Sequence, residues 1–239
     1  MKHSPLALIV ALLAVGFAIS PIFSNGFGGF APEYFPVLQI DPPVQPAGYA
    51  FSIWGVIFFA LIASSLYGVL RAPDDPDWQA MRPALSVSLG LGVFWIAAAN
   101  AAPPLATMMI LLMAAGAVRA MLVAGEAKPW LLVRPIALYA GWLTAASGVA
   151  IGVLLGGYGV LSPQSAALLC LGLVLLTALI IQSRRPGEWA YPAAVIWALV
   201  GVLVDNLPGP NLPVIALTAL GIALLGARIV LTLIKGALP

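Results

Sequence analysis

Residues 135–156 read PIALYAGWLTAASGVAIGVLLG, a run of 22 residues without a charged side chain. A helix needs about 20 apolar residues to cross a bilayer core about 30 Å thick, so this run predicts a transmembrane helix. The rest of the chain has the same character, since 62% of its 239 residues are hydrophobic and only 8% are charged. Soluble domains carry about 25% charged residues. The chain is therefore expected to be an integral membrane protein.

Working outward from this run, charges, prolines and glycines divide the chain into eight apolar stretches. The predicted spans are residues 5–23, 48–70, 84–101, 104–124, 135–156, 164–182, 189–205 and 212–234. These stretches are too long and alternate too little for barrel strands, and backbone groups in hydrocarbon must be paired within their own segment. The predicted fold is an all-α integral membrane protein with eight transmembrane helices.

Basic residues occupy alternate connections between these spans. They are Lys2 before the first span, Arg71 and Arg82, Lys128 and Arg134, and Arg184 and Arg185 in every second connection, and Lys235 after the last span. The intervening connections carry no Lys or Arg. Because basic residues gather on cytoplasmic loops, the pattern predicts a multi-pass protein of a bacterial-type inner membrane with both termini in the cytoplasm. Pro21 disfavours the alternative reading of the first span as a cleaved signal peptide.

The content of titratable residues excludes several classes of function. One cysteine, Cys170, and one histidine, His3, cannot form a disulfide framework, a Cys/His zinc site or a histidine pair for haem iron. The basic residues are scattered, which excludes a nucleic-acid surface. No Asp, Glu or His lies at the middle of a span, so a proton relay and ordinary acid-base catalysis lack their residues. We expect a protein that is not an enzyme and has no metal and no covalent cofactor.

The longest connection, residues 24–47, combines stiff and aromatic residues. Its members of interest are Pro32, Pro36, Pro42, Pro43 and Pro46, together with Phe27, Phe30, Tyr34 and Phe35. Long loops in compact proteins are commonly functional or disordered. The aromatic residues favour an ordered lid that docks on the helix bundle.

The other tryptophans and the arginines within spans have plain interpretations. Trp78, Trp130 and Trp189 lie at predicted helix ends and are interpreted as interfacial anchors. Arg119 and Arg228 lie inside predicted spans, where their long side chains can reach the interface. The alternative for these arginines is pairing with an anionic group of a ligand or lipid.

Two segments carry a family resemblance: Pro46–Gly55 reads PAGYAFSIWG, and Tyr139–Gly148 reads YAGWLTAASG. They resemble the TspO/MBR family of tryptophan-rich sensory or translocator proteins, whose members are five-helix membrane bundles with a long loop after the first helix. The resemblance covers about residues 1–157, including loop 24–47. Residues 158–239 form three additional predicted helices, so the chain is interpreted as a divergent, extended member. Ala150 stands where the family usually has asparagine.

The resemblance implies a pocket inside the five-helix bundle, roofed by the long loop, for a flat hydrophobic molecule such as a porphyrin, haem or sterol. The spacing agrees, because Phe51, Trp54 and Phe58 share one helix face. Aromatic residues with few polar groups are typical of small-molecule sites. The candidate ligand-binding residues are Tyr49, Phe51, Trp54, Phe58, Trp95, Tyr139, Trp142 and Ala146. The small residues after Trp142 serve either ligand space or close helix packing.

We therefore expect a tetrapyrrole-binding or related sensor, carrier or regulator embedded in the lipid bilayer. Three alternatives remain open at this stage: a small-molecule transporter that uses all eight helices, an accessory subunit of a larger membrane complex, and a porphyrin-degrading activity on Trp54 and Trp142 that the resemblance suggests. A homodimer is also compatible with the sequence.

Overall fold

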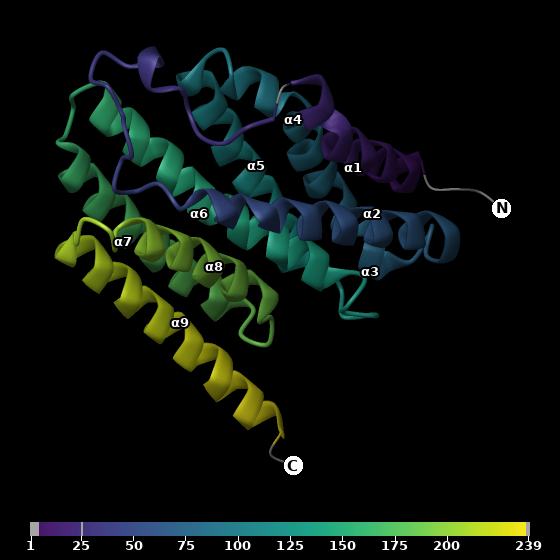
Figure 1. The fold of residues 1–239 in the computed structure, drawn as a ribbon. Coiled ribbons are helices and arrows are strands. Elements are labelled where there is room, and N and C mark those ends of the chain that lie inside the picture. Colours follow the sequence, from purple (N-terminus) through teal and green to yellow (C-terminus); the bar gives the residue numbers. More distant parts are fainter. Residues whose placement is uncertain (1–4, 25, 238–239) are drawn as a thin grey trace.

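The computed structural model describes residues 5–24 and 26–237, and these residues are helical wherever they form regular structure (Figure 1). The α-helices are α1 (Pro5–Phe23), α2 (Ile53–Arg71), α3 (Pro76–Gln79), α4 (Arg82–Ala99), α5 (Pro103–Val123), α6 (Val133–Gly157), α7 (Pro163–Arg184), α8 (Ala190–Asp205) and α9 (Leu212–Ala237), and the 3-10 helices are η1 (Pro32–Tyr34) and η2 (Gly48–Ser52). Seven helices are long and apolar enough to cross a membrane, and α8 is an apolar helix of 16 residues. The predicted all-α membrane fold is confirmed.

The predicted spans match these helices closely, with one change at the second span. Residues 48–70 divide into the 3-10 helix η2 and the α-helix α2, which begins at Ile53. The short helix α3 lies in the connection that follows α2. The chain is therefore already helical for one turn before α2 begins, which affects where Tyr49 and Phe51 lie.

Helix α6 lies at the centre of the bundle and packs against α2, α5, α7 and α8 (Figure 1). Its small residues allow this. Gly141 faces the backbone of α8, where an added Cβ would overlap the carbonyl oxygen of Tyr191 and lie 3.0 Å from Cβ of Ala194. Gly148 faces α7, where an added Cβ would overlap Cγ2 of the Val174 side chain and lie 3.4 Å from the carbonyl oxygen of Cys170. Small residues permit such backbone approach between membrane helices, so the α6 glycines set the positions of α7 and α8.

Helix α6 packs against α2 and α5, which precede residue 157 in the sequence, and against α7 and α8, which follow it. Both predicted portions of the chain therefore pack on this helix. The division into residues 1–157 and 158–239 stays a prediction. It describes the order of the helices along the chain.

The basic connections meet at one end of the bundle. The backbone N–H of Gly125 donates to the carbonyl oxygen of Asp77 at 3.1 Å. Nη1 of Arg185 donates to the carbonyl oxygens of Met121 and Ala124 at 2.6 and 2.7 Å. The connections after α2, α5 and α7 therefore lie together, as alternate crossing requires. Lys2 and His3 lie outside the described residues, and the side of the membrane at this end stays a prediction.

Arg82, at this same end, is 1% exposed and closes the C-terminus of α2. Its guanidinium donates to the carbonyl oxygens of Gly68, Ala72 and Pro73. The last carbonyls of a helix have no partner within the helix, so a buried cation that bonds them satisfies both groups. Arg82 thereby fixes the turn from α2 to α4.

Trp78 differs from its expected role as an interfacial anchor. It is 1% exposed because α3 turns the indole inward, where it packs against Tyr67 with ring centroids 5.5 Å apart and against Gly68. Trp130 is 68% exposed, as an interfacial position requires. The prediction for Trp78 was wrong because a short helix in the connection is not visible in the hydropathy pattern.

Loop 24–47 lies across the opposite end of the bundle (Figure 1). The hydroxyl of Tyr34 donates to the carbonyl oxygen of Asn100 at 2.6 Å, and Nδ2 of Asn100 donates to the carbonyl oxygen of Ser24 at 2.6 Å. The N–H of Val37 donates to the carbonyl oxygen of Gly157, and Nδ2 of Asn206 donates to that of Pro43. The loop is thus docked on α4, α6 and α8, as expected for a lid.

Candidate functional site

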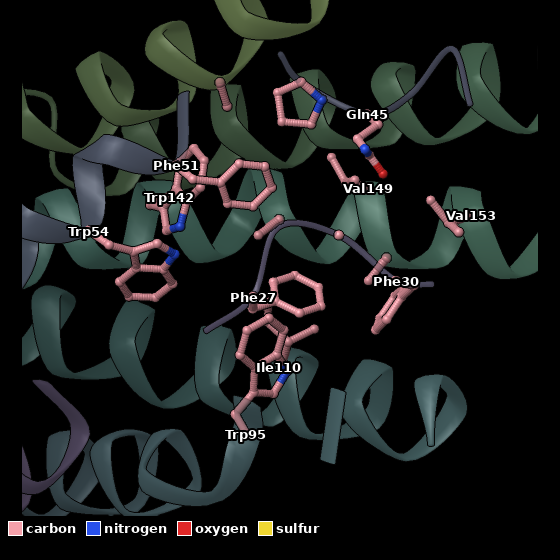
Figure 2. Close-up of a pocket in the computed structure, with 15 residues that line it drawn as sticks. Phe27, Phe30, Gln45, Phe51, Trp54, Trp95, Ile110, Trp142, Val149 and Val153 are labelled. Carbon is pink, nitrogen blue, oxygen red and sulfur yellow. The ribbon is translucent and has the colours of Figure 1, made fainter. Parts of the chain in front are cut away.

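An aromatic pocket lies beneath loop 24–47, between α2, α4 and α6 (Figure 2). It encloses about 50 Å³. Its lining comprises Phe27, Gly29, Phe30, Gln45 and Pro46 of the loop, Phe51 and Trp54, Trp95 and Ile110, Trp142, Ala146, Val149, Ala150 and Val153 of α6, and Ala198 of α8. Residues far apart in the sequence, from Phe27 to Ala198, therefore converge on one apolar space.

A second cavity of about 200 Å³ adjoins the first and shares Phe27, Phe51, Trp54 and Trp95 with it. Its remaining lining residues are Phe17 and Pro21 of α1, Phe58 of α2 and Ile96 of α4. The shared rings form the partition between the two spaces. A change in the position of these rings would join them into one site.

The rings in the pocket contact one another edge to face. Phe27 lies over Trp95 with ring centroids 4.8 Å apart, and Trp142 lies 6.0 Å from Phe51 and 6.2 Å from Trp54. Figure 2 shows Phe51, Trp54 and Trp142 grouped on one side, and Phe27 and Trp95 on the other. Edge-to-face pairs are favourable by about 0.5–1.5 kcal/mol, so the loop ring Phe27 helps to hold the lid closed.

The indole N–H of Trp142 is the unusual polar group of the pocket. Trp142 is 2% exposed, and its Nε1 atom has no hydrogen-bond partner in the part of the chain that the structure describes. Nε1 of Trp95, by contrast, donates to the carbonyl oxygen of Ala106 at 2.9 Å. Buried indole N–H groups usually find an acceptor. The pocket thus offers aromatic faces, the unused indole donor of Trp142, the amide of Gln45 and no charged lining residue, which suits a flat apolar molecule with a polar edge.

Most of the predicted site residues line one of the two cavities. Phe51, Trp54, Trp95, Trp142 and Ala146 line the first cavity, and Phe58 lines the second with three of the same rings. Ala146 borders the cavity while Gly148, half a turn further, receives α7. The small residues after Trp142 therefore serve both cavity space and close helix packing.

Tyr49 lies outside both cavities. It is 45% exposed and packs against Trp197 of α8, with ring centroids 5.7 Å apart. Tyr49 and Phe51 are two residues apart, so their side chains leave the turn η2 on roughly opposite sides. Tyr49 was included because it lies in the segment that resembles the family, and not because of the face that Phe51, Trp54 and Phe58 share.

Tyr139 lies behind the pocket and does not line it. Its side chain is fully buried, and its hydroxyl is 3.0 Å from Oγ of Ser88, which donates to the carbonyl oxygen of Met113 at 2.7 Å. The ring lies 6.3 Å from Trp54 and 6.1 Å from Phe17. Tyr139 therefore supports the ring of Trp54 from the core.

Several lining residues were not among the predicted site residues. Val149 and Val153 follow Trp142 and Ala146 at spacings of three and four residues, so the helical period of α6 could have identified them. Phe27 and Phe30 were expected to dock on the bundle but not to line the pocket. Ala198 of α8 had no signal in the sequence, because nothing local indicates that α8 returns to the pocket.

The chain matches the model of a known protein family. The model of the family described as TSPO-like protein matches residues 6–232. The matched range extends beyond residue 157, where the resemblance in the sequence ended, and includes the C-terminal helices. No curated protein and no solved structure matches the chain.

Proposed function

The chain belongs to the TSPO-like protein family, and we propose that it binds a flat hydrophobic molecule of the porphyrin, haem or sterol class in the aromatic pocket. In this proposal the protein acts as a sensor, carrier or regulator in a bacterial-type inner membrane, with the basic end of the bundle in the cytoplasm. It has no catalytic role.

The observation that carries this proposal is the ring arrangement around Nε1 of Trp142. Three tryptophans and three phenylalanines from the loop, η2, α2, α4 and α6 meet at one apolar space. Stacking on these faces supplies affinity for a flat molecule, and the buried donor favours one with an acceptor at its edge. No histidine lies in the described part of the chain, so the proposed binding rests on the macrocycle and not on a histidine bond to iron.

Ligand entry in this proposal requires the lid to move. The cavities of about 50 and 200 Å³ are smaller than the roughly 300–1,000 Å³ of sites for drug-sized molecules. The loop residue Phe27 packs its ring on Trp95, so displacement of this ring would enlarge the pocket. The ligand would therefore bind a state with the loop raised and shift the population toward it.

Titration with protoporphyrin IX tests the function directly. Purified protein in neutral detergent is expected to show saturable quenching of tryptophan fluorescence, with similar affinity for protoporphyrin IX and for haem. The Trp54→Ala, Trp142→Ala double variant should bind at least tenfold more weakly. Trp130→Ala, at the opposite end of the bundle and 68% exposed, is the matched control and should bind as the wild type does. Absence of saturation, or equal affinity in the double variant, would refute the proposal.

A second prediction concerns the lid. Phe27→Ala removes the ring that packs on Trp95 and should accelerate protoporphyrin association severalfold in stopped-flow fluorescence, because the closed loop loses a favourable contact. Phe94→Ala is the control, since Phe94 is 68% exposed on α4 and lines neither cavity. Equal association rates for Phe27→Ala and the wild type would show that the lid does not limit entry.

A further inference from the structure

A further cavity, of different chemistry, lies at the basic end of the bundle, far from the aromatic pocket along the helices. It encloses about 510 Å³ between the connection from α5 to α6 and the connection from α7 to α8. Its charged lining residues are Glu126, Arg134, Arg184, Arg185 and Glu188. Three guanidinium groups thus face two carboxylates across one space at the level of the helix ends.

Arg134 is held in this cavity by aromatic rings. Its Cζ atom lies 4.0 Å from the ring centroid of Trp130 and 5.6 Å from that of Trp189, and the two rings contact each other at 5.8 Å. Cation–π contact fixes the faces of a guanidinium and leaves its N–H edges for hydrogen bonds. Tryptophans at helix ends also place this arginine at the depth of the membrane interface.

The donors of Arg134 are not used within the described chain. Its Nε and Nη1 atoms are buried and have no hydrogen-bond partner there. Two other arginines bond carbonyl groups at helix ends, Arg82 at α2 and Arg185 at α5. Buried charged donors need an acceptor, and the side-by-side N–H groups of a guanidinium match two oxygens of a phosphate or carboxylate.

The surroundings favour an anion over a cation. Arg184, the last residue of α7, is exposed and adds a second guanidinium group that bonds no described residue. Helix α6 begins beside the cavity without a side-chain cap, so no side chain in the described ranges accepts from the backbone N–H groups of its first turn. Oε1 of Glu188 already accepts from the backbone N–H of Ala190 at 2.9 Å. Burial raises the pKa of the Glu188 carboxyl, and the nearby Arg134 and Arg185 guanidinium groups oppose this shift. The charged lining thus comprises three guanidinium groups and two carboxylates, which leaves the cavity with an excess of positive charge.

We propose that this cavity is a binding site for a phosphate group, held by Arg134 between Trp130 and Trp189 with help from Arg184. The phosphate belongs either to the headgroup of an anionic lipid or to a free phosphate compound. Both sources present the same oxygens to the guanidinium edges. Arg134 at the interface is within reach of either.

Two binding measurements separate the sources. Calorimetric titration of the purified protein in neutral detergent with inorganic phosphate tests the free anion. Native mass spectrometry of protein from mixed micelles compares retention of phosphatidylglycerol with that of phosphatidylcholine. Saturable phosphate binding supports a free compound, and selective retention of phosphatidylglycerol without phosphate binding supports a lipid headgroup. Absence of both would overturn the proposal.

Four variants locate the site. Arg134→Gln should weaken binding of the effective probe at least tenfold, and Arg184→Gln about threefold. Glu188→Gln should strengthen it, because the variant removes a negative charge from the cavity. Arg71→Gln, an exposed arginine at the end of α2, should bind as the wild type does. Unchanged binding in both Arg184→Gln and Glu188→Gln would overturn the proposal even if Arg134→Gln does not fold.

Discussion

Gly141→Ala is expected to lower the free energy of unfolding by about 3 kcal/mol, although it adds a single methyl group to a helix. The added Cβ would overlap the carbonyl oxygen of Tyr191 and crowd Cβ of Ala194, so α6 and α8 must separate. The backbone oxygen cannot move away as a flexible side chain would. Helix propensity alone would stabilise the alanine variant by about 1 kcal/mol. A measured loss of stability would therefore report the contact between α6 and α8.

Unfolding in mixed micelles of a mild detergent and sodium dodecyl sulfate, followed by tryptophan fluorescence, measures this effect. Gly172→Ala is the matched control, because Gly172 lies inside α7 and an added Cβ there meets no atom within 4 Å. Gly172→Ala should leave the stability unchanged or raise it slightly. Equal stability of the two variants would mean that α6 and α8 do not touch at Gly141.

Arg82→Met is expected to destabilise the protein by about 3 kcal/mol, because it leaves the carbonyl groups of Gly68, Ala72 and Pro73 without their shared donor. Methionine retains most of the apolar stem, so the loss reports the hydrogen bonds. Arg82→Lys should recover part of the stability, since an ammonium can reach some of these oxygens but cannot span them as a planar guanidinium does.

The same unfolding titration serves for this variant, with Arg71→Met as its control. Arg71 ends α2 but is exposed and makes no side-chain hydrogen bond among the described residues, so its loss should cost less than about 0.5 kcal/mol. A loss of similar size for Arg71→Met and Arg82→Met would show that net charge at this end matters, and not the bonds to the end of α2.

The two chemical environments of the bundle lie at opposite ends. Rings and apolar residues gather beneath loop 24–47, where a flat hydrophobic molecule is proposed to bind. Arginines gather at the other end. Arg82 and Arg185 bond carbonyl groups at the ends of α2 and α5, and Arg134 is proposed to bind a phosphate group. Because the central helix α6 carries Trp142 in its middle and Arg134 in its first turn, it contributes to both sites.

Most of the candidate site residues that line a cavity are carried by a regular helix. Trp54 and Trp142 meet because each lies on a predicted helix whose apolar face turns inward. Tyr49 lies outside the cavities, where it packs against Trp197 of α8, and Tyr139 lies behind them, where its hydroxyl contacts Ser88 on α4. Both positions depend on contacts with residues distant in the sequence.

The sequence by itself determined the membrane class, the eight apolar helices and the grouping of the basic connections, because hydrocarbon demands long uncharged runs and charge is costly within them. Tertiary structure alone decided which helices touch, which rings line a cavity and which arginines keep free donors. These depend on close approach at Gly141 and Gly148 and on long-range bonds to backbone carbonyls. Hydropathy records the presence of an apolar face but not the identity of its neighbour.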